Sequence, residues 1–118
     1  MPKILIVDDA EFLRVRLTKM LDTDGFEVFQ AENGVKAVEV YKQIHPDVVL
    51  MDVTMPEMDG LTALKTIVSF DPKAKVIMLT ALGQESVVLE AVKSGARDFI
   101  VKPFEHDRVM KAIGKLLA

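Results

Sequence analysis

The sequence predicts an α/β fold, a (βα)5 doubly wound sheet of five parallel strands alternating with five helices. Strand-like apolar runs and helical periodicities alternate five times along its 118 residues. The runs at 4–7, 48–51 and 76–79 are continuously apolar, as is typical of strands buried on both faces of a parallel sheet. Half of the residues are hydrophobic, enough for the core of one domain spanning 1–118.

The predicted strands are rich in valine and isoleucine, which favour extended structure. The run at 26–30 is more mixed than the others, which fits a strand at the edge of the sheet. The five strands are expected at 3–7, 26–30, 47–51, 75–79 and 97–101.

Between the strands, apolar residues recur at the three- and four-residue spacing that places them on one face of a helix. Gly25 and Gly95 stand where helices should end, and Asn33 suits the N-cap position of the second helix. The five expected helical faces are Leu13, Leu17, Met20 and Leu21; Ala37, Tyr41 and Ile44; Leu61, Leu64, Ile67 and Val68; Val88, Ala91 and Val92; and Val109, Ile113 and Leu116.

Composition excludes several classes of protein. No cysteine is present, which excludes disulfides, thiolate zinc sites and a cysteine nucleophile. The first apolar run is interrupted by Asp8 and Asp9, so neither a signal peptide nor a membrane span is predicted, and we expect a cytoplasmic protein. The net charge is −3, and no basic run interleaves with aromatic residues, so nucleic acid is not an expected partner.

Polar residues stand at the ends of four of the apolar runs: Asp8, Asp9, Asp52, Thr80 and Lys102. Because the carboxyl ends of parallel strands line one crevice, we expect these side chains to meet there. Three carboxylates, a hydroxyl and an ammonium suit a divalent cation and a phosphoryl group. All-oxygen ligands favour Mg²⁺ or Mn²⁺ over zinc. The alternative is that these aspartates merely cap helices or lie in turns.

Asp52 is the predicted nucleophile, because an aspartate carboxylate can attack phosphorus to form an acyl phosphate. The ammonium of Lys102 can pair with a carboxylate at rest and with a phosphoryl oxygen afterwards. The hydroxyl of Thr80 can donate to a phosphoryl oxygen. Viewed singly, Thr80 and Lys102 also fit ordinary strand-end residues.

Together these residues resemble the receiver domains of two-component response regulators, and most of all the stand-alone chemotaxis members of that family. The resemblance covers the whole chain and implies a flavodoxin-like fold with strand order 2-1-3-4-5. The segments that carry it are Ile-Val-Asp-Asp at 6–9, Met-Asp-Val-Thr-Met-Pro-Glu-Met-Asp-Gly at 51–60, Leu-Thr-Ala at 79–81, Gly-Ala-Arg-Asp-Phe at 95–99 and Val-Lys-Pro-Phe at 101–104.

The resemblance implies that Asp52 accepts a phosphoryl group from a phosphohistidine of a sensor histidine kinase. Asp9, Asp52 and the backbone carbonyl of Thr54 would ligate Mg²⁺, and Asp8 would assist directly or through water. Thr54 and Leu82 stand where the family tunes the lifetime of the acyl phosphate.

Thr80 and Lys102 would hold the phosphoryl oxygens, and the Lys102–Pro103 peptide bond would be cis. Phe99 stands at the family's switch aromatic, whose ring moves inward when the threonine is drawn toward the phosphoryl group. The chemotaxis members best known for this motion carry tyrosine there. The alternative for Phe99 is a plain core phenylalanine.

The implied function is a signalling switch, not an enzyme, which catalyses only its own phosphorylation and autodephosphorylation. The expected partners are a sensor histidine kinase and a phosphorylation-dependent target such as a flagellar motor switch protein, and the chain itself would be a monomer. The expected target surface comprises helix 84–94, strand 97–101 and helix 105–117, with exposed Val87 and the basic residues Lys93, Lys111 and Lys115.

Other functions fit the sequence less completely. A phosphorelay intermediate, or a receiver cut from a longer regulator, would look almost the same. A metal-dependent aspartyl phosphatase of the haloacid dehalogenase type needs a second acid where this chain has Thr54, and a cap insertion that the chain lacks. A flavodoxin-like cofactor carrier needs a phosphate-cradling first loop, whereas the loop at 8–11 is Asp-Asp-Ala-Glu, which repels phosphate unless a metal is bound.

Overall fold

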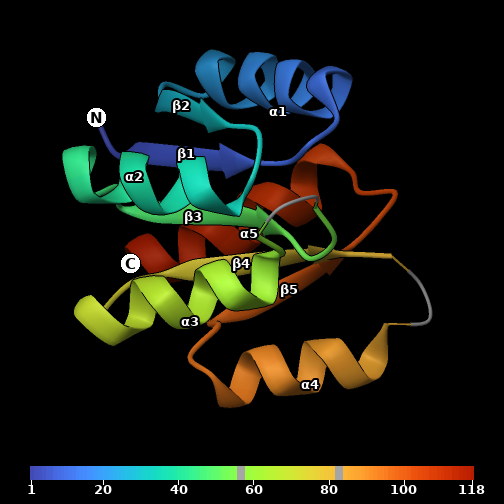
Figure 1. Cartoon of the computed structure of the whole chain (residues 1–118). Helices are drawn as coiled ribbons and strands as arrows, with labels where there is room; N and C mark the ends of the chain where they lie inside the picture. Colours follow the sequence, from blue (N-terminus) through green and yellow to red (C-terminus); the bar gives the residue numbers. More distant parts are fainter. Residues whose placement is uncertain (56–57, 82–83) are drawn as a thin grey trace.

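The computed structural model describes residues 1–55, 58–81 and 84–118, in which five strands alternate with five helices (Figure 1). The strands are β1 (Lys3–Val7), β2 (Glu27–Ala31), β3 (Val48–Asp52), β4 (Val76–Thr80) and β5 (Asp98–Val101). The helices are α1 (Glu11–Thr23), α2 (Gly34–Ile44), α3 (Gly60–Phe70), α4 (Glu85–Lys93) and α5 (His106–Leu117). None of these helices is both long and apolar enough to cross a membrane.

All neighbouring strands pair in parallel, in the order β2-β1-β3-β4-β5, which confirms the predicted fold and strand order. In Figure 1 the arrowheads point toward the same end of the molecule, so the carboxyl ends of the strands form one edge. β2 lies at the border of the sheet and is only partly buried, as its mixed composition predicted.

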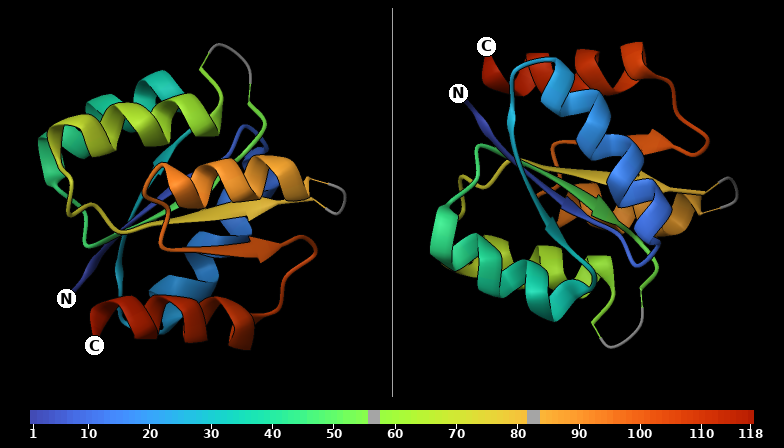
Figure 2. Two further views of the ribbon diagram at one scale, coloured as in Figure 1. Left: turned by 90° about the horizontal axis from the view of Figure 1, so that it is seen from below. Right: turned by 90° about the horizontal axis from the view of Figure 1, so that it is seen from above.

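Helices cover both faces of the sheet, α1 and α5 on one face and α2, α3 and α4 on the other (Figure 2). Successive residues of a strand point to opposite faces, so each central strand feeds two cores. In β1, Leu5 and Val7 join the core beneath α2 and α3, while Ile4 and Ile6 join the core beneath α1 and α5. This double covering explains why the central strands are continuously apolar.

Strand boundaries differ from the prediction by one residue, because β2 to β5 each begin one position later than expected. β3 and β4 therefore include their polar end residues, Asp52 and Thr80. The reason is that backbone pairing continues past the apolar run: the Lys102 N–H donates to the Thr80 carbonyl oxygen at 2.7 Å. The sheet thus holds the backbone of both residues.

Helix ends follow the sequence signals. Gly25 and Gly95 have positive φ angles of 87° and 113°, a conformation that glycine adopts without strain, directly after α1 and α4. The Asn33 side chain accepts a hydrogen bond from the Lys36 N–H at 2.9 Å, which confirms it as the N-cap of α2. The N-cap residue of α1 is Ala10, so the interpretation of Asp8 and Asp9 as its cap is wrong.

The start of α3 lies against the end of β3. A Cβ atom added to Gly60 would lie 1.9 Å from the backbone oxygen of Asp52, far inside van der Waals contact. The Gly60 N–H also donates to the Val53 carbonyl oxygen at 2.9 Å. Glycine at position 60 therefore allows the helix to dock directly on the backbone that carries Asp52.

We expect Gly60→Ala to lower the free energy of unfolding by about 2 kcal/mol, because the new methyl group must displace rigid backbone. Gly114→Ala is the matched control, since an added Cβ there meets nothing within 4 Å and Gly114 lies in α5. Removing a glycine from an open helical position should stabilise the protein by roughly 0.5–1 kcal/mol. Urea unfolding of both variants tests this pair, and equal effects would refute the proposed close approach.

Candidate functional site

Three carboxylates gather at the carboxyl edge of the sheet. Asp8 and Asp9 follow β1, and Asp52 is the last residue of β3, the strand beside it. One carboxylate oxygen from each of the three lies within 4.8 Å of the other two. Asp8 and Asp52 are buried whereas Asp9 is exposed, so the cluster opens to solvent on one side.

Lys102 bridges two of these carboxylates. Its Nζ donates to Asp52 Oδ1 at 2.9 Å and to Asp8 Oδ2 at 3.1 Å. The lysine reaches them from the segment just after β5, where the Lys102–Pro103 bond is cis, as the resemblance implied. The structure therefore brings Asp8, Asp9, Asp52 and Lys102 together.

The pKa values of Asp52 and Lys102 follow from burial and from the charges around them. Burial raises the pKa of Asp52, and the charges of Asp8 and Asp9 add to this, against the opposing hydrogen bond from Lys102. Burial alone would lower the pKa of Lys102, but its contacts with Asp52 and Asp8 outweigh it and raise the pKa. The lysine therefore stays protonated, and its ammonium pairs with two of the three carboxylates, Asp8 and Asp52.

The donor set fits a divalent cation that prefers oxygen, such as Mg²⁺. Both oxygens of Asp8 already accept a hydrogen bond, Oδ1 from the Ala10 N–H at 2.9 Å and Oδ2 from Lys102. Asp8, Asp9 and Asp52 could all hold such an ion, Asp8 either directly or through water. The expected ligation by the Thr54 carbonyl stays a prediction; Thr54 lies two residues beyond β3 and is exposed.

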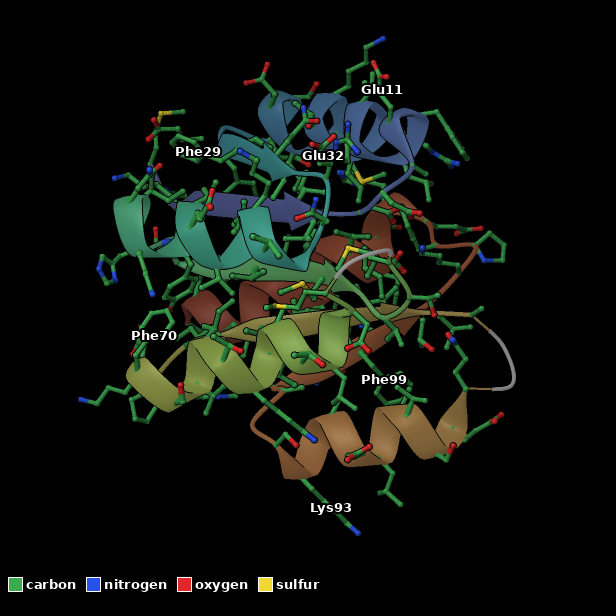
Figure 3. All side chains as sticks on the ribbon, in the orientation of Figure 1. Glu11, Phe29, Glu32, Phe70, Lys93 and Phe99 are labelled. Carbon is green, nitrogen blue, oxygen red and sulfur yellow. The ribbon has the colours of Figure 1, made fainter. Side chains whose placement is uncertain are left out.

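Thr80 and Phe99 meet at a separate feature beside the acidic cluster. Both line an apolar hollow of about 280 Å³ between α4 and the end of β5. Thr80 is buried, whereas Phe99 is 38% exposed, so the interpretation of Phe99 as a plain core residue is wrong. Figure 3 shows Phe99 beside α4 and Lys93 projecting away from the body of the protein.

The expected target surface needs one correction. Val87 was predicted to be exposed, but it is half-buried and packs against the core beneath α2 and α3. Leu89 and Val92 are the exposed apolar residues of α4, with exposed fractions of 58% and 48%. The sequence periodicity of α4 is compatible with several rotations, and packing selects the one that buries Val87.

Two residues at the site were not predicted from the sequence. Arg14 donates from Nη1 to the Asp8 carbonyl oxygen at 2.7 Å and so braces the turn after β1. Gln84 contacts both Thr80 and Thr54. An isolated glutamine in a loop carries no motif, so no sequence signal marked it. Leu82, which the resemblance placed at the site, lies outside the described residues.

Comparison with known proteins supports one family. The profile of the response regulator receiver domain matches residues 4–114. The chain is 57% identical over 116 residues to the chemotaxis protein CheY of Bacillus subtilis, covering 98% of this chain and 97% of that protein. It is 51% identical over 115 residues to CheY of Thermotoga maritima, covering 97% and 96%. A solved complex of CheX, CheY, BeF3 and magnesium from Borrelia burgdorferi contains a chain with a TM-score of 0.93 and 39% identity, covering 98% of this chain and 89% of that one.

We expect Asp52→Asn to raise the free energy of unfolding at neutral pH by about 1 kcal/mol, because it removes a buried negative charge from beside Asp8 and Asp9. Because the folded-state pKa of Asp52 is raised, the folded protein binds this proton more tightly than the unfolded chain. The stability associated with Asp52 is thus present at low pH and lost as pH rises through the raised pKa. Wild type and variant should therefore converge on acidification. Urea unfolding across pH measures this, and a variant less stable than wild type at pH 7 would contradict it.

Proposed function

The chain belongs to the response regulator receiver family, and on that basis we propose that it is a phosphorylation-activated switch. Asp52 accepts a phosphoryl group from a phosphohistidine of a sensor histidine kinase. The observation that carries this proposal is the pairing of a buried Asp52 with Lys102 inside a cluster of three carboxylates. A purely structural ion pair needs no second and third carboxylate beside it.

The transfer is a displacement at phosphorus. An oxygen of Asp52 forms the new P–O bond as the P–N bond to histidine breaks, and the leaving imidazole takes up a proton from solvent. Such transfers depend on positioning and on charge stabilisation. Asp9, Asp52 and the Thr54 carbonyl would hold Mg²⁺, which would supply positive charge against the phosphoryl oxygens. Lys102, which pairs with Asp52 at rest, then pairs with a phosphoryl oxygen.

The switch operates through Thr80 and Phe99. The Thr80 hydroxyl turns toward the phosphoryl oxygen, and the Phe99 ring moves into the hollow that both residues line. Phenylalanine has no hydroxyl that needs a partner, so burial of its apolar ring alone favours the inward state. A target that binds the inward state more tightly shifts the protein toward it.

The target surface lies on α4, β5 and α5. It combines the exposed apolar residues Leu89 and Val92 with the exposed lysines Lys93, Lys111 and Lys115. Such a surface suits a partner with an apolar contact patch and acidic neighbours. We propose a role in chemotaxis with a flagellar motor switch protein as the target, supported by the likeness to CheY proteins over nearly their full length. In this role the chain is a cytoplasmic monomer.

Incubation with Mg²⁺ and a small acyl phosphate such as acetyl phosphate should add one phosphoryl unit to the intact protein. Asp52→Ala should abolish the mass increase, because it removes the proposed nucleophile, whereas Asp8, which also accepts from Lys102, is held by the Ala10 N–H as well. Asp22→Ala, at an exposed aspartate of α1, should be labelled like wild type. Intact-mass spectrometry reads all three proteins. Equal labelling of Asp52→Ala and wild type would disprove the assignment.

Mg²⁺ should stabilise the protein against unfolding, because it binds the folded acidic cluster and not the unfolded chain. At a hundred times its dissociation constant the gain is about 2.7 kcal/mol. Asp9→Asn should lose most of this gain, whereas Asp22→Asn, the same charge change outside the cluster, should keep it. Thermal unfolding with and without Mg²⁺ measures the difference. Equal gains in all three proteins would place the ion elsewhere.

A further inference from the structure

Gln84 links the two threonines that flank the phosphorylation site. It is half-buried and lies directly before α4. Its Oε1 accepts from the Ala81 N–H at 2.8 Å and faces Thr80 Oγ1 at 2.9 Å, while its Nε2 lies 3.2 Å from Thr54 Oγ1. One amide group therefore contacts the end of β4 and the segment after β3.

The Ala81 N–H fixes the direction of every bond in this group. A backbone N–H only donates, so the amide atom facing it must be the oxygen. The Thr80 hydroxyl faces the same oxygen and must therefore donate to it. The amide nitrogen then points to Thr54, whose hydroxyl oxygen accepts. Two donors fill the two lone pairs of Gln84 Oε1.

A hydroxyl has one proton, so Thr80 cannot donate to Gln84 and to a phosphoryl oxygen at the same time. Thr80 is 2% exposed, which limits the access of water as a substitute acceptor. The other acceptor that the structure offers is the Ala81 carbonyl oxygen, at a longer 3.2 Å. The bond to Gln84 thus stabilises the resting state and is absent from the state in which Thr80 binds the phosphoryl group.

We propose that Gln84 is a positioning residue that latches Thr80 in the resting conformation and so sets the threshold for activation. This inference rests on the proposed function, since it identifies Gln84 as the hydrogen-bond acceptor that the Thr80 hydroxyl must leave before it can bind the phosphoryl group. Because Gln84 directly precedes Glu85, the first residue of α4, its bond from Thr80 ties that hydroxyl to the start of the helix. The latch therefore couples the hydroxyl of Thr80 to the helix of the target surface.

The test measures the affinity of the Mg²⁺-loaded protein for beryllofluoride, a phosphoryl mimic, by NMR titration. Gln84→Ala should bind beryllofluoride about five-fold more tightly than wild type, the factor that corresponds to one hydrogen bond of ordinary net strength. Without beryllofluoride, its Phe99 amide resonance should already be shifted toward the beryllofluoride-bound position, because the Phe99 N–H donates to Asp98 and not to Gln84. Ser86→Ala, an exposed change in the first turn of α4, should match wild type in both measurements.

A double-mutant cycle separates the latch from a general effect on α4. In a Thr80→Ala background there is no hydroxyl to release, so Gln84→Ala should leave the beryllofluoride affinity unchanged. A five-fold gain that persists in that background would overturn the latch, as would equal affinities of Gln84→Ala and wild type. If wild type itself does not bind beryllofluoride with Mg²⁺, the proposed function fails; if wild type binds and the variant does not differ, the latch alone fails.

Discussion

The structure depends on a charge balance at the carboxyl edge of the sheet. Asp52 ends β3, Asp8 and Asp9 follow the neighbouring strand β1, and one carboxylate oxygen of each of the three lies within 4.8 Å of the other two. Like charges in a buried position raise each other's free energy, so the fold needs a cation there. Lys102 supplies it, and its bonds to Asp8 and Asp52 tie the end of β5 to the ends of β1 and β3. The remaining negative charge of the cluster would favour the binding of a divalent cation.

Much of the architecture and the central site followed from the sequence. Continuous apolar runs mark strands with both faces covered, and parallel pairing forces their carboxyl ends together. That reasoning was enough to bring Asp8, Asp52 and Lys102 to one place, although 94 positions separate the first from the last. The order of the strands required the family resemblance, because hydrophobicity alone does not decide which buried strand lies beside which.

The rotation of a helix about its axis, the register of a strand and the rotamer of a side chain could not be predicted from the sequence in the same way. Val87 and Val92 are chemically identical, and only the packing of α4 decides that the first is half-buried and the second exposed. The ends of β3 and β4 follow backbone pairing and not hydropathy, so they run one residue beyond the apolar segments. Gln84 reaches the site through a side-chain orientation that the Ala81 N–H selects, which no pattern of residue types encodes.

The distance along the sequence between Asp8 and Lys102 also affects how the chain folds during synthesis on the ribosome. Synthesis proceeds from the N-terminus, so a growing chain carries all three aspartates long before its lysine is made. Until β5 and the segment after it have emerged, Asp8 and Asp52 lack the ammonium of Lys102. The emergence of Lys102 is thus the step that first allows the ion pairs with Asp8 and Asp52 to form.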